Sequence, residues 1–200
     1  MLMGIRFLCS PTPHQKLTLS QWIGCSRVIW NAKCQEYQYH RSFAAQVDEP
    51  GAQPPIDQKY SHFKDKELTP WLYQCPSQLL RNSAVNWYNT FQHHLKGRCG
   101  KPKFKKKHDN ISLHLTRELF SFETCPNSGR LRLFIGTKTN NIGYLQVHYH
   151  TDQFDLPKSI RIKKKHGRYW VSFCYEDSLD TSGLLDQKGH LEQLREKSVE

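Results

Sequence analysis

The sequence divides at residues 97–107, which read GRCGKPKFKKK. Six of these residues are basic and none is acidic. Two glycines and a proline make the stretch a poor helix or central strand, whereas its charge suits contact with phosphate groups. Residues before it repeat with a helical period, and residues after it alternate as strands do. The stretch therefore predicts a basic loop between two differently folded parts, although lysine-rich surface loops also occur without any partner.

Two long helices are predicted before this loop. At 13–45 and at 77–95, apolar side chains recur every three or four residues and form one apolar face. Within that face we expect Trp22 and Trp30 to pack in the core. Residues 57–66 could form one short helix. The segment between the long helices far exceeds the short turn of a DNA-reading helix-turn-helix, so the pattern predicts a small helical bundle instead.

Period-two alternation marks the strands, at 4–9 near the N-terminus and then after the basic loop at 112–116, 118–124, 130–135, 142–149, 159–165 and 168–175. The last two should form a hairpin across His166 and Gly167. The predicted fold is α+β, a small antiparallel β-barrel with a helical-bundle insertion after the first strand. Residues 1–10 form the first barrel strand and residues 11–98 the helical insertion. Residues 99–175 form the rest of the barrel with its basic loops, and residues 176–200 are an acidic linker.

The chain has 200 residues, a formal net charge of +11 and a pI of about 9.4. Residues 176–200 carry seven acids and three bases, so the first 175 residues carry +15. Such an excess points to polyanions, with nucleic acid ahead of an acidic membrane surface. No apolar run is long enough to span a membrane. Seven cysteines without a C-x-x-C pair predict reduced thiols in a cytoplasmic protein.

Motifs for catalysis are absent from the sequence. There is no H-E-x-x-H, G-x-S-x-G or P-loop, and the eighteen acids are scattered or lie in the acidic tail. His148 and His150 share a strand face, but the sequence marks no third metal ligand beside them. A Cys-His pair that meets only in the fold stays open. The sequence favours a binding module with no cofactor and no catalytic centre.

A second basic cluster lies on the predicted hairpin, and it consists of Lys158, Arg161, Lys163, Lys164, Lys165 and Arg168. Aromatic residues stand near both clusters, namely Phe104 in the loop and Tyr169 and Trp170 on the hairpin. Cations that neutralise phosphates and aromatic rings that stack on bases are typical of nucleic-acid-binding surfaces. Because neighbours on a strand point to opposite faces, either Tyr169 or Trp170 should face the core.

Several short motifs occur in an order that resembles the N-terminal part of the TnpB proteins, also called OrfB-type transposon proteins. These are relatives of the compact type V CRISPR effectors. The motifs are residues 11–15, the segment 24–32 (GCSRVIWNA), Ser77–Arg81 with Ala84 and Phe91, the segment 100–106 (GKPKFKK), and Ile142-Gly143 with 167–172. The segments 24–32 and 100–106 are similar to the family patterns G-x-x-R-x-x-W/Y-N and G-x-P-x-F-K-K.

The resemblance implies a wedge-like β-barrel with an inserted helical recognition region. It also implies partners: a guide RNA from the element itself, and DNA that is bound beside a short motif and cut by a RuvC-like nuclease domain. Pairing reads the target, while the protein reads shape and the adjacent motif. The family's G-I/V-D-x-G motif and zinc cysteines do not follow here. We therefore expect that the nuclease domain is missing, together with its divalent metal and zinc, in a truncated, fragmentary or degenerate copy.

The expected function is to hold guide RNA and the DNA next to the target. Candidate residues on the basic loop and hairpin are Arg98, Lys101, Lys103, Phe104, Lys105, Lys106, Lys107, Lys163, Lys164, Lys165 and Arg168. On the second helix they are Gln78 and Arg81, near the DNA duplex. Arg27 and Asn31 are either contacts or structural hydrogen-bond bridges. Two alternatives remain open, a stand-alone DNA-binding regulator or accessory protein and an inactive transposon remnant.

Overall fold

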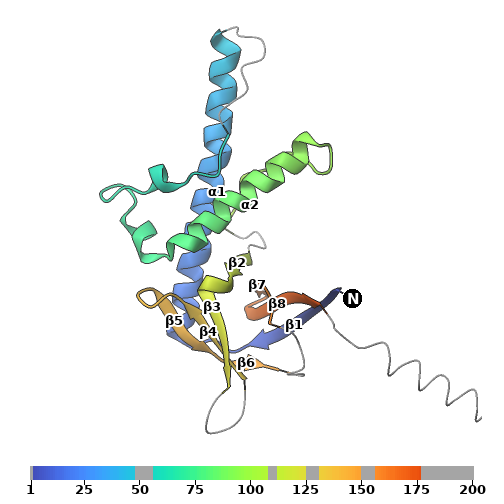
Figure 1. The fold of residues 1–200 in the computed structure, drawn as a ribbon. Helices are drawn as coiled ribbons and strands as arrows, with labels where there is room; N and C mark the ends of the chain where they lie inside the picture. The colour runs from blue at the N-terminus through green and yellow to red at the C-terminus, as the bar shows by residue number, and fades with distance from the viewer. Residues whose placement is uncertain (1, 48–55, 108–111, 125–130, 150–155, 177–200) are drawn as a thin grey trace, which may run out of the picture.

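Figure 1 shows the computed structural model of the chain, which describes residues 2–47, 56–107, 112–124, 131–149 and 156–176. The two long helices are α1 (Pro13–Val47) and α2 (Ser77–Leu95). The strands are β1 (Leu2–Cys9), β2 (Ser112–Thr116), β3 (Phe120–Thr124), β4 (Leu131–Gly136), β5 (Asn141–Leu145), β6 (Val147–His148), β7 (Ser159–Lys165) and β8 (Arg168–Glu176). The α+β class is confirmed. No described helix is long and apolar enough to cross a membrane.

Local capping explains where α1 begins. The hydroxyl of Thr12 accepts a hydrogen bond from the backbone N–H of Gln15, and the Gln15 side chain accepts one from the N–H of Thr12. This reciprocal pair is a capping box, with Pro13 at the first helical position. The Gln15 amide also donates to the carbonyls of Ile142 and Tyr144 on β5. The cap therefore fixes the start of α1 and ties it to the sheet.

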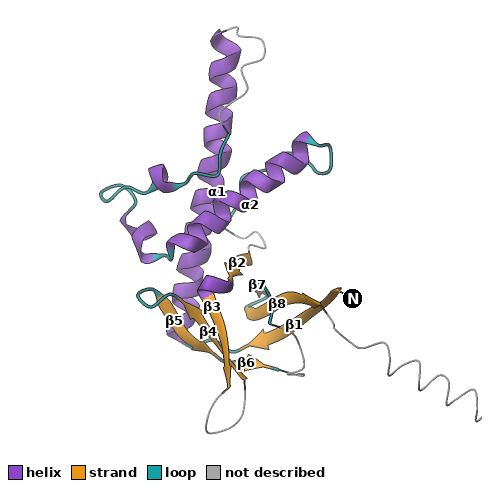
Figure 2. Ribbon diagram, viewed as in Figure 1, coloured by secondary structure: helices purple, strands orange, loops and turns teal. Residues whose placement is uncertain are grey.

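The two helices cross (Figure 2). Aromatic side chains pack between them. Trp30 and Cys34 on α1 meet Trp87 and Phe91 on α2, and all four are buried. Trp22 is buried in the larger core beneath the sheets. Both tryptophan predictions are confirmed. Beyond this contact the C-terminal part of α1 projects away from the rest of the fold (Figure 1).

The strands form two antiparallel sheets. One has five strands in the order β2-β7-β8-β1-β6, and the other has three in the order β3-β4-β5. Strand β1 pairs with β8 along its whole length, from Leu2 with Glu176 to Cys9 with Tyr169. The prediction that the first strand joins the last strands, with the helices inserted after it, is therefore confirmed.

Neither sheet closes into a barrel, so the predicted barrel is not confirmed. The ladder breaks where the chain passes from one sheet to the other. Between β2 and β3, residues Arg117–Leu119 form a 3-10 turn, and between β5 and β6 Gln146 lies outside both strands. Its carbonyl accepts a hydrogen bond from the Ser10 N–H instead. The two sheets share a core that includes Leu113, Leu133 and Ile162 without a continuous ring of hydrogen bonds.

The hairpin and the segment before α2 test two further predictions from the sequence. The hairpin is confirmed, with Lys165 paired to Arg168 and positive φ angles at His166 and Gly167, as a two-residue type I′ turn requires. The short helix predicted at 57–66 is wrong, because only Ser61–Phe63 form a 3-10 turn. The described chain has a second short 3-10 helix, at Pro70–Gln74, before α2.

Candidate nucleic-acid interface

The basic loop begins where α2 ends. Gly97 adopts a left-handed conformation with φ 68°, and its N–H donates to the carbonyl of His94. The N–H of Arg98 donates to the carbonyl of His93. These two bonds form a Schellman motif, in which glycine tolerates the positive φ that ends a helix. The following residues, 101–107, have no regular secondary structure, and we call them the basic segment.

Side chains of α1 hold the basic segment through its backbone. The Asn31 amide donates to the carbonyl of Lys105 at 3.0 Å, and its oxygen accepts from the Lys105 N–H at 2.8 Å. The indole N–H of Trp30 donates to the carbonyl of Lys103 at 2.9 Å. These bonds use backbone atoms of the basic segment, so they fix its main chain. The two motifs 24–32 and 100–106 therefore contact each other directly.

Two lysines of the segment lie over aromatic rings of α1. The Lys105 ammonium is 3.4 Å from the Trp30 ring centroid, and that of Lys101 is 4.5 Å from the Tyr37 centroid. Trp30 and Tyr37 are two helical turns apart, so the segment follows α1 in the opposite direction. The other candidates here, Lys103, Phe104, Lys106 and Lys107, are exposed, as is Arg98 before them. Asn31 is a bridge to the loop rather than between the helices.

Replacing Asn31 with alanine is expected to loosen the basic segment without unfolding the protein. Both lost bonds go to a partly solvated backbone, so water can replace them, and the cost should be about 1–2 kcal/mol in total. The direct measurement is hydrogen exchange at the Lys105 amide, which should speed up at least ten-fold. Exchange at the Leu113 amide in β2 is the internal control. Equal Lys105 protection in the variant would contradict the bridging role of Asn31.

Part of the second basic cluster lies on the outer face of the five-stranded sheet. Ile160 and Ile162 of β7 are buried, whereas Arg161 and Lys163 alternate with them on the opposite face. On β8 the ring of Tyr169 is buried and Trp170 is on the outer face, paired across from Lys163. The expectation that one of the two aromatics faces the core is therefore confirmed. The Arg6 guanidinium of β1 lies 4.7 Å from the Trp170 ring centroid.

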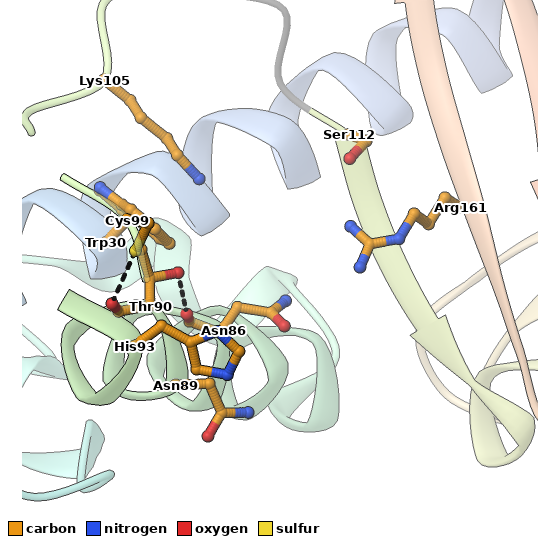
Figure 3. A pocket seen from close by; sticks show the side chains of 9 residues that line it. All are labelled: Trp30, Asn86, Asn89, Thr90, His93, Cys99, Lys105, Ser112 and Arg161. Carbon is orange, nitrogen blue, oxygen red and sulfur yellow. Dashed lines mark hydrogen bonds between the residues drawn. The ribbon is translucent and has the colours of Figure 1, made fainter. Parts of the chain in front are cut away.

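The two basic clusters meet at one pocket of about 370 Å³ (Figure 3). Lys105 of the basic segment and Arg161 of β7 line it from different sides. The polar face of α2 forms another wall, through Asn86, Asn89, Thr90 and His93, while Trp30, Cys99 and Ser112 complete the lining. The pocket thus combines two cations with a row of amide, hydroxyl and imidazole groups.

Electrostatics at the pocket favour an anion. Among the described residues, Arg161 has no acidic partner, and the ion pairs involve Glu36 and Asp57 on another side of α1. Burial, reinforced by the charge of Arg161, lowers the pKa of His114. His114 is therefore neutral near pH 7, and it shares a hydrogen bond with Asn86. The uncompensated charge of Arg161 remains for a ligand.

Other predicted contacts lie away from this pocket. Arg81 is exposed on a different side of α2, and Gln78 donates a hydrogen bond to Asn82. Lys164, Lys165 and Arg168 are exposed at the tip of the hairpin, and Arg27 is half-buried one turn before Asn31. The structure brings together Asn31, Lys105 and the hairpin cluster through Arg161. It does not place Gln78 and Arg81 with them.

Sequence reasoning missed the α2 wall of the pocket. Asn86, Asn89, Thr90 and His93 recur at helical spacing beside the apolar stripe, and this spacing was the available signal. Such a row also fits an ordinary solvated face. The possible metal pair has little support, since His148 is hydrogen bonded to Ser10, and His150 lies outside the described residues. Within the described ranges no group of three His, Cys, Asp or Glu side chains could hold a metal ion.

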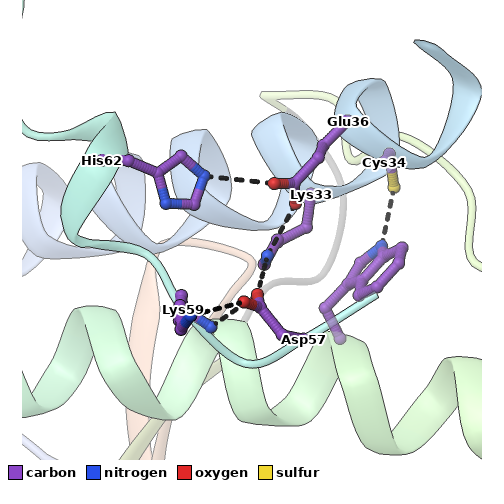
Figure 4. Close-up of polar contacts among 7 residues, drawn as sticks. Lys33, Cys34, Glu36, Asp57, Lys59 and His62 are labelled. Carbon is purple, nitrogen blue, oxygen red and sulfur yellow. Dashed lines mark hydrogen bonds and ion pairs between the residues drawn. The ribbon is translucent and has the colours of Figure 1, made fainter. Parts of the chain in front are cut away.

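A separate polar cluster connects α1 to the segment before α2 (Figure 4). The buried ammonium of Lys33 pairs with Glu36 at 2.6 Å and with Asp57 at 2.9 Å. His62 lies 3.2 Å from the other oxygen of Glu36. Both carboxylates are neutralised within the cluster, and none of these residues lines the pocket. This cluster therefore orders the fold.

Residues 1–41 match the family model HTH_OrfB_IS605, described as a helix-turn-helix domain. The match supports an N-terminal region of the TnpB/OrfB type. Over these residues the structure has β1 and one unbroken stretch of α1, without a second helix after a short turn. The match supports a DNA-binding transposon protein. No curated protein matches the chain significantly.

Proposed function

We propose that this TnpB/OrfB-type region binds nucleic acid in the cytoplasm, and that it holds a guide-type RNA together with the DNA beside the target. The observation that carries the proposal is the convergence of the two basic clusters on one pocket, with Lys105 and Arg161 facing it. Cations spread over the basic segment and the hairpin suit a strand of phosphates, and contacts of this kind are salt-dependent. Catalysis, a divalent metal and zinc belong to the nuclease domain of this family and have no role in these steps.

Each part of the surface has a proposed role. The basic segment and the hairpin hold RNA backbone, because both carry exposed lysines on a fixed main chain. Arg81, on a different side of α2, and Gln78, near the start of that helix, approach the DNA duplex. This division lets one molecule contact both nucleic acids at once, as RNA-guided recognition requires.

Neutralising the basic segment tests the proposal. Replacing Lys103, Lys105, Lys106 and Lys107 with glutamine should weaken RNA binding at least ten-fold at low salt. The slope of log K against log salt should fall by up to about 0.7 for each lost contact with single-stranded RNA. Fluorescence anisotropy at several salt concentrations measures both quantities.

A matched control removes the same number of charges elsewhere. Lys16, Arg41, Lys66 and Lys138 are exposed and lie outside both clusters. Changing them to glutamine should leave the salt slope close to that of the unaltered protein. If the control loses as much affinity as the basic-segment variant, net charge alone explains binding, and the assigned surface is wrong.

A second measurement addresses the guide. The protein is purified at moderate salt, and the RNA that accompanies it is sequenced. One enriched transcript with a defined end supports guide binding. Tight sequence-specific binding to duplex DNA in the absence of RNA would instead favour a stand-alone regulator, which the family description as a helix-turn-helix domain also suits.

A further inference from the structure

The pocket between α2, the basic segment and β7 has the size and chemistry of a single-nucleotide site. Its volume of about 370 Å³ lies near the lower end of the roughly 300–1,000 Å³ that small-molecule sites occupy. Such a volume admits one base with its sugar but not a base pair with two backbones. A double helix could lie across the mouth, whereas only an unpaired nucleotide could enter.

The α2 wall offers hydrogen bonds that suit a base edge. Asn89 is exposed, and its amide has a donor and an acceptor side by side. An asparagine amide pairs in this bidentate manner with adenine N6 and N7. Asn86, one turn earlier, is already oriented by its hydrogen bond to His114. Asn89 is therefore the residue best placed to distinguish one base from another.

The opposite walls offer positive charge. Lys105 is held in place by the bonds of Asn31 to its backbone and lies against the Trp30 ring. Arg161 projects from β7 toward the pocket (Figure 3). In a strand, phosphates lie on both sides of each base. The two cations could therefore contact the phosphates while the amides of α2 contact the base.

We propose that this pocket accepts one unpaired nucleotide, preferentially adenosine, extruded from the strand that the basic clusters hold. This inference deepens the proposed nucleic-acid binding and rests on it. Extrusion costs least where a nucleotide is already unpaired. The ligand is therefore a bulge, a loop or a strand end, and the same chemistry serves RNA and DNA.

Binding to hairpins tests the inference. The probes are hairpins of identical stem with no bulge, or with one bulged adenine, uracil (thymine in DNA), cytosine or guanine, made once as RNA and once as DNA. The full chain should bind the adenine bulge roughly ten-fold more tightly than the uninterrupted stem, as expected for one bidentate contact. The difference between the RNA and DNA series identifies the source of the nucleotide.

Variants separate base recognition from charge. Asn89→Ala should abolish the preference for the adenine bulge over the uninterrupted stem. Arg161→Gln should weaken binding of both hairpins. Gln38→Ala, at an exposed amide on α1 outside the pocket, is the matched control and should change neither. Equal binding of bulged and uninterrupted hairpins by the unaltered protein, or an adenine preference that survives Asn89→Ala, would overturn the inference.

A second readout comes from the cysteines. Cys99 lines the pocket, whereas Cys174 lies away from it on β8, and both are exposed. Alkylation with N-ethylmaleimide, followed by peptide mass spectrometry, should show Cys99 protected by the adenine-bulged hairpin and less so by the uninterrupted stem. The extent of alkylation at Cys174 measures any protection that does not depend on the pocket. Binding of both hairpins without selective protection of Cys99 would refute the pocket but retain the proposed function, and no binding at all would refute both.

Discussion

Replacing Trp87 with alanine is expected to destabilise the protein by about 3–5 kcal/mol. Trp87 is 1% exposed, and its ring stacks on Phe91 with 5.4 Å between centroids and 4° between planes. Its indole N–H donates to the Cys34 sulfur at 3.1 Å. The variant would leave a large cavity between α1 and α2 and remove that hydrogen bond. Urea denaturation followed by circular dichroism measures the loss.

The matched control is Tyr39→Ala. Tyr39 is an aromatic residue of α1 that is 67% exposed, so its removal should change the free energy of unfolding by less than about 0.5 kcal/mol. A cost below about 1 kcal/mol for Trp87→Ala would show that the two helices do not depend on this aromatic contact. The contact also matters for binding, because Trp30 in the same cluster holds the carbonyl of Lys103.

The helices could be predicted because their signals are local. An apolar face of helical period, the capping box at Thr12 and Gln15, and Gly97 at the end of α2 all act within a few residues. The hairpin β7–β8 was predictable for the same reason, since His166 and Gly167 suit a tight turn. These elements have the predicted bounds to within about two residues.

Whether the strands close into a barrel could not be predicted from local sequence patterns. Whether two sheets close depends on hydrogen bonds between strands that lie far apart in the sequence. The breaks occur at Arg117–Leu119 and at Gln146, and neither has a glycine or proline to mark it. The predicted strand 142–149 therefore runs through Gln146, and the predicted strand 118–124 includes two residues of the 3-10 turn.

The candidate site was predictable in composition but not in arrangement. Lysine runs identify the basic segment and the hairpin, yet only the fold brings Lys105 and Arg161 to opposite sides of one pocket. Asn31 illustrates the same limit, because a polar residue beside an apolar helical face fits either a ligand contact or a structural bridge. Its partner is the backbone of Lys105, and a contact with backbone atoms does not depend on which residue occupies that position, so the sequence does not reveal it.

Lys33 is the clearest case of a residue whose environment the sequence conceals. It flanks the predicted apolar face of α1, and its side chain is fully buried between Glu36, Asp57 and the Phe63 ring. Lys33→Ala should cost about 3 kcal/mol, because it leaves two carboxylates without their cation. This cost is at the lower end of the roughly 3–5 kcal/mol expected for breaking a buried ion pair, since the Asp57 side chain is 41% exposed and can be hydrated. Thermal and urea unfolding near pH 7 measure the loss.

The pH dependence gives this prediction a second, independent test. Burial raises the pKa of the Asp57 carboxyl, but the hydrogen bonds from Lys33 and the Lys59 N–H, with the charge of Lys33, outweigh it and lower that pKa. A lowered pKa contributes stability above the unfolded value near ~3.9, and the contribution is lost as the pH falls through the folded value. The stability difference between the unaltered protein and Lys33→Ala should therefore be constant from pH 7 to about pH 5 and shrink below about pH 4.

Lys59→Ala separates burial from mere proximity of charge. Lys59 also approaches Asp57, at 3.7 Å, but its side chain is 79% exposed, and surface pairs of this kind contribute about 0–1 kcal/mol. Its removal should change stability by less than about 0.5 kcal/mol and leave the acid dependence nearly intact. If Lys59→Ala costs as much as Lys33→Ala, the total charge around Asp57 holds residues 56–63 to α1, and the buried ammonium has no special part in it.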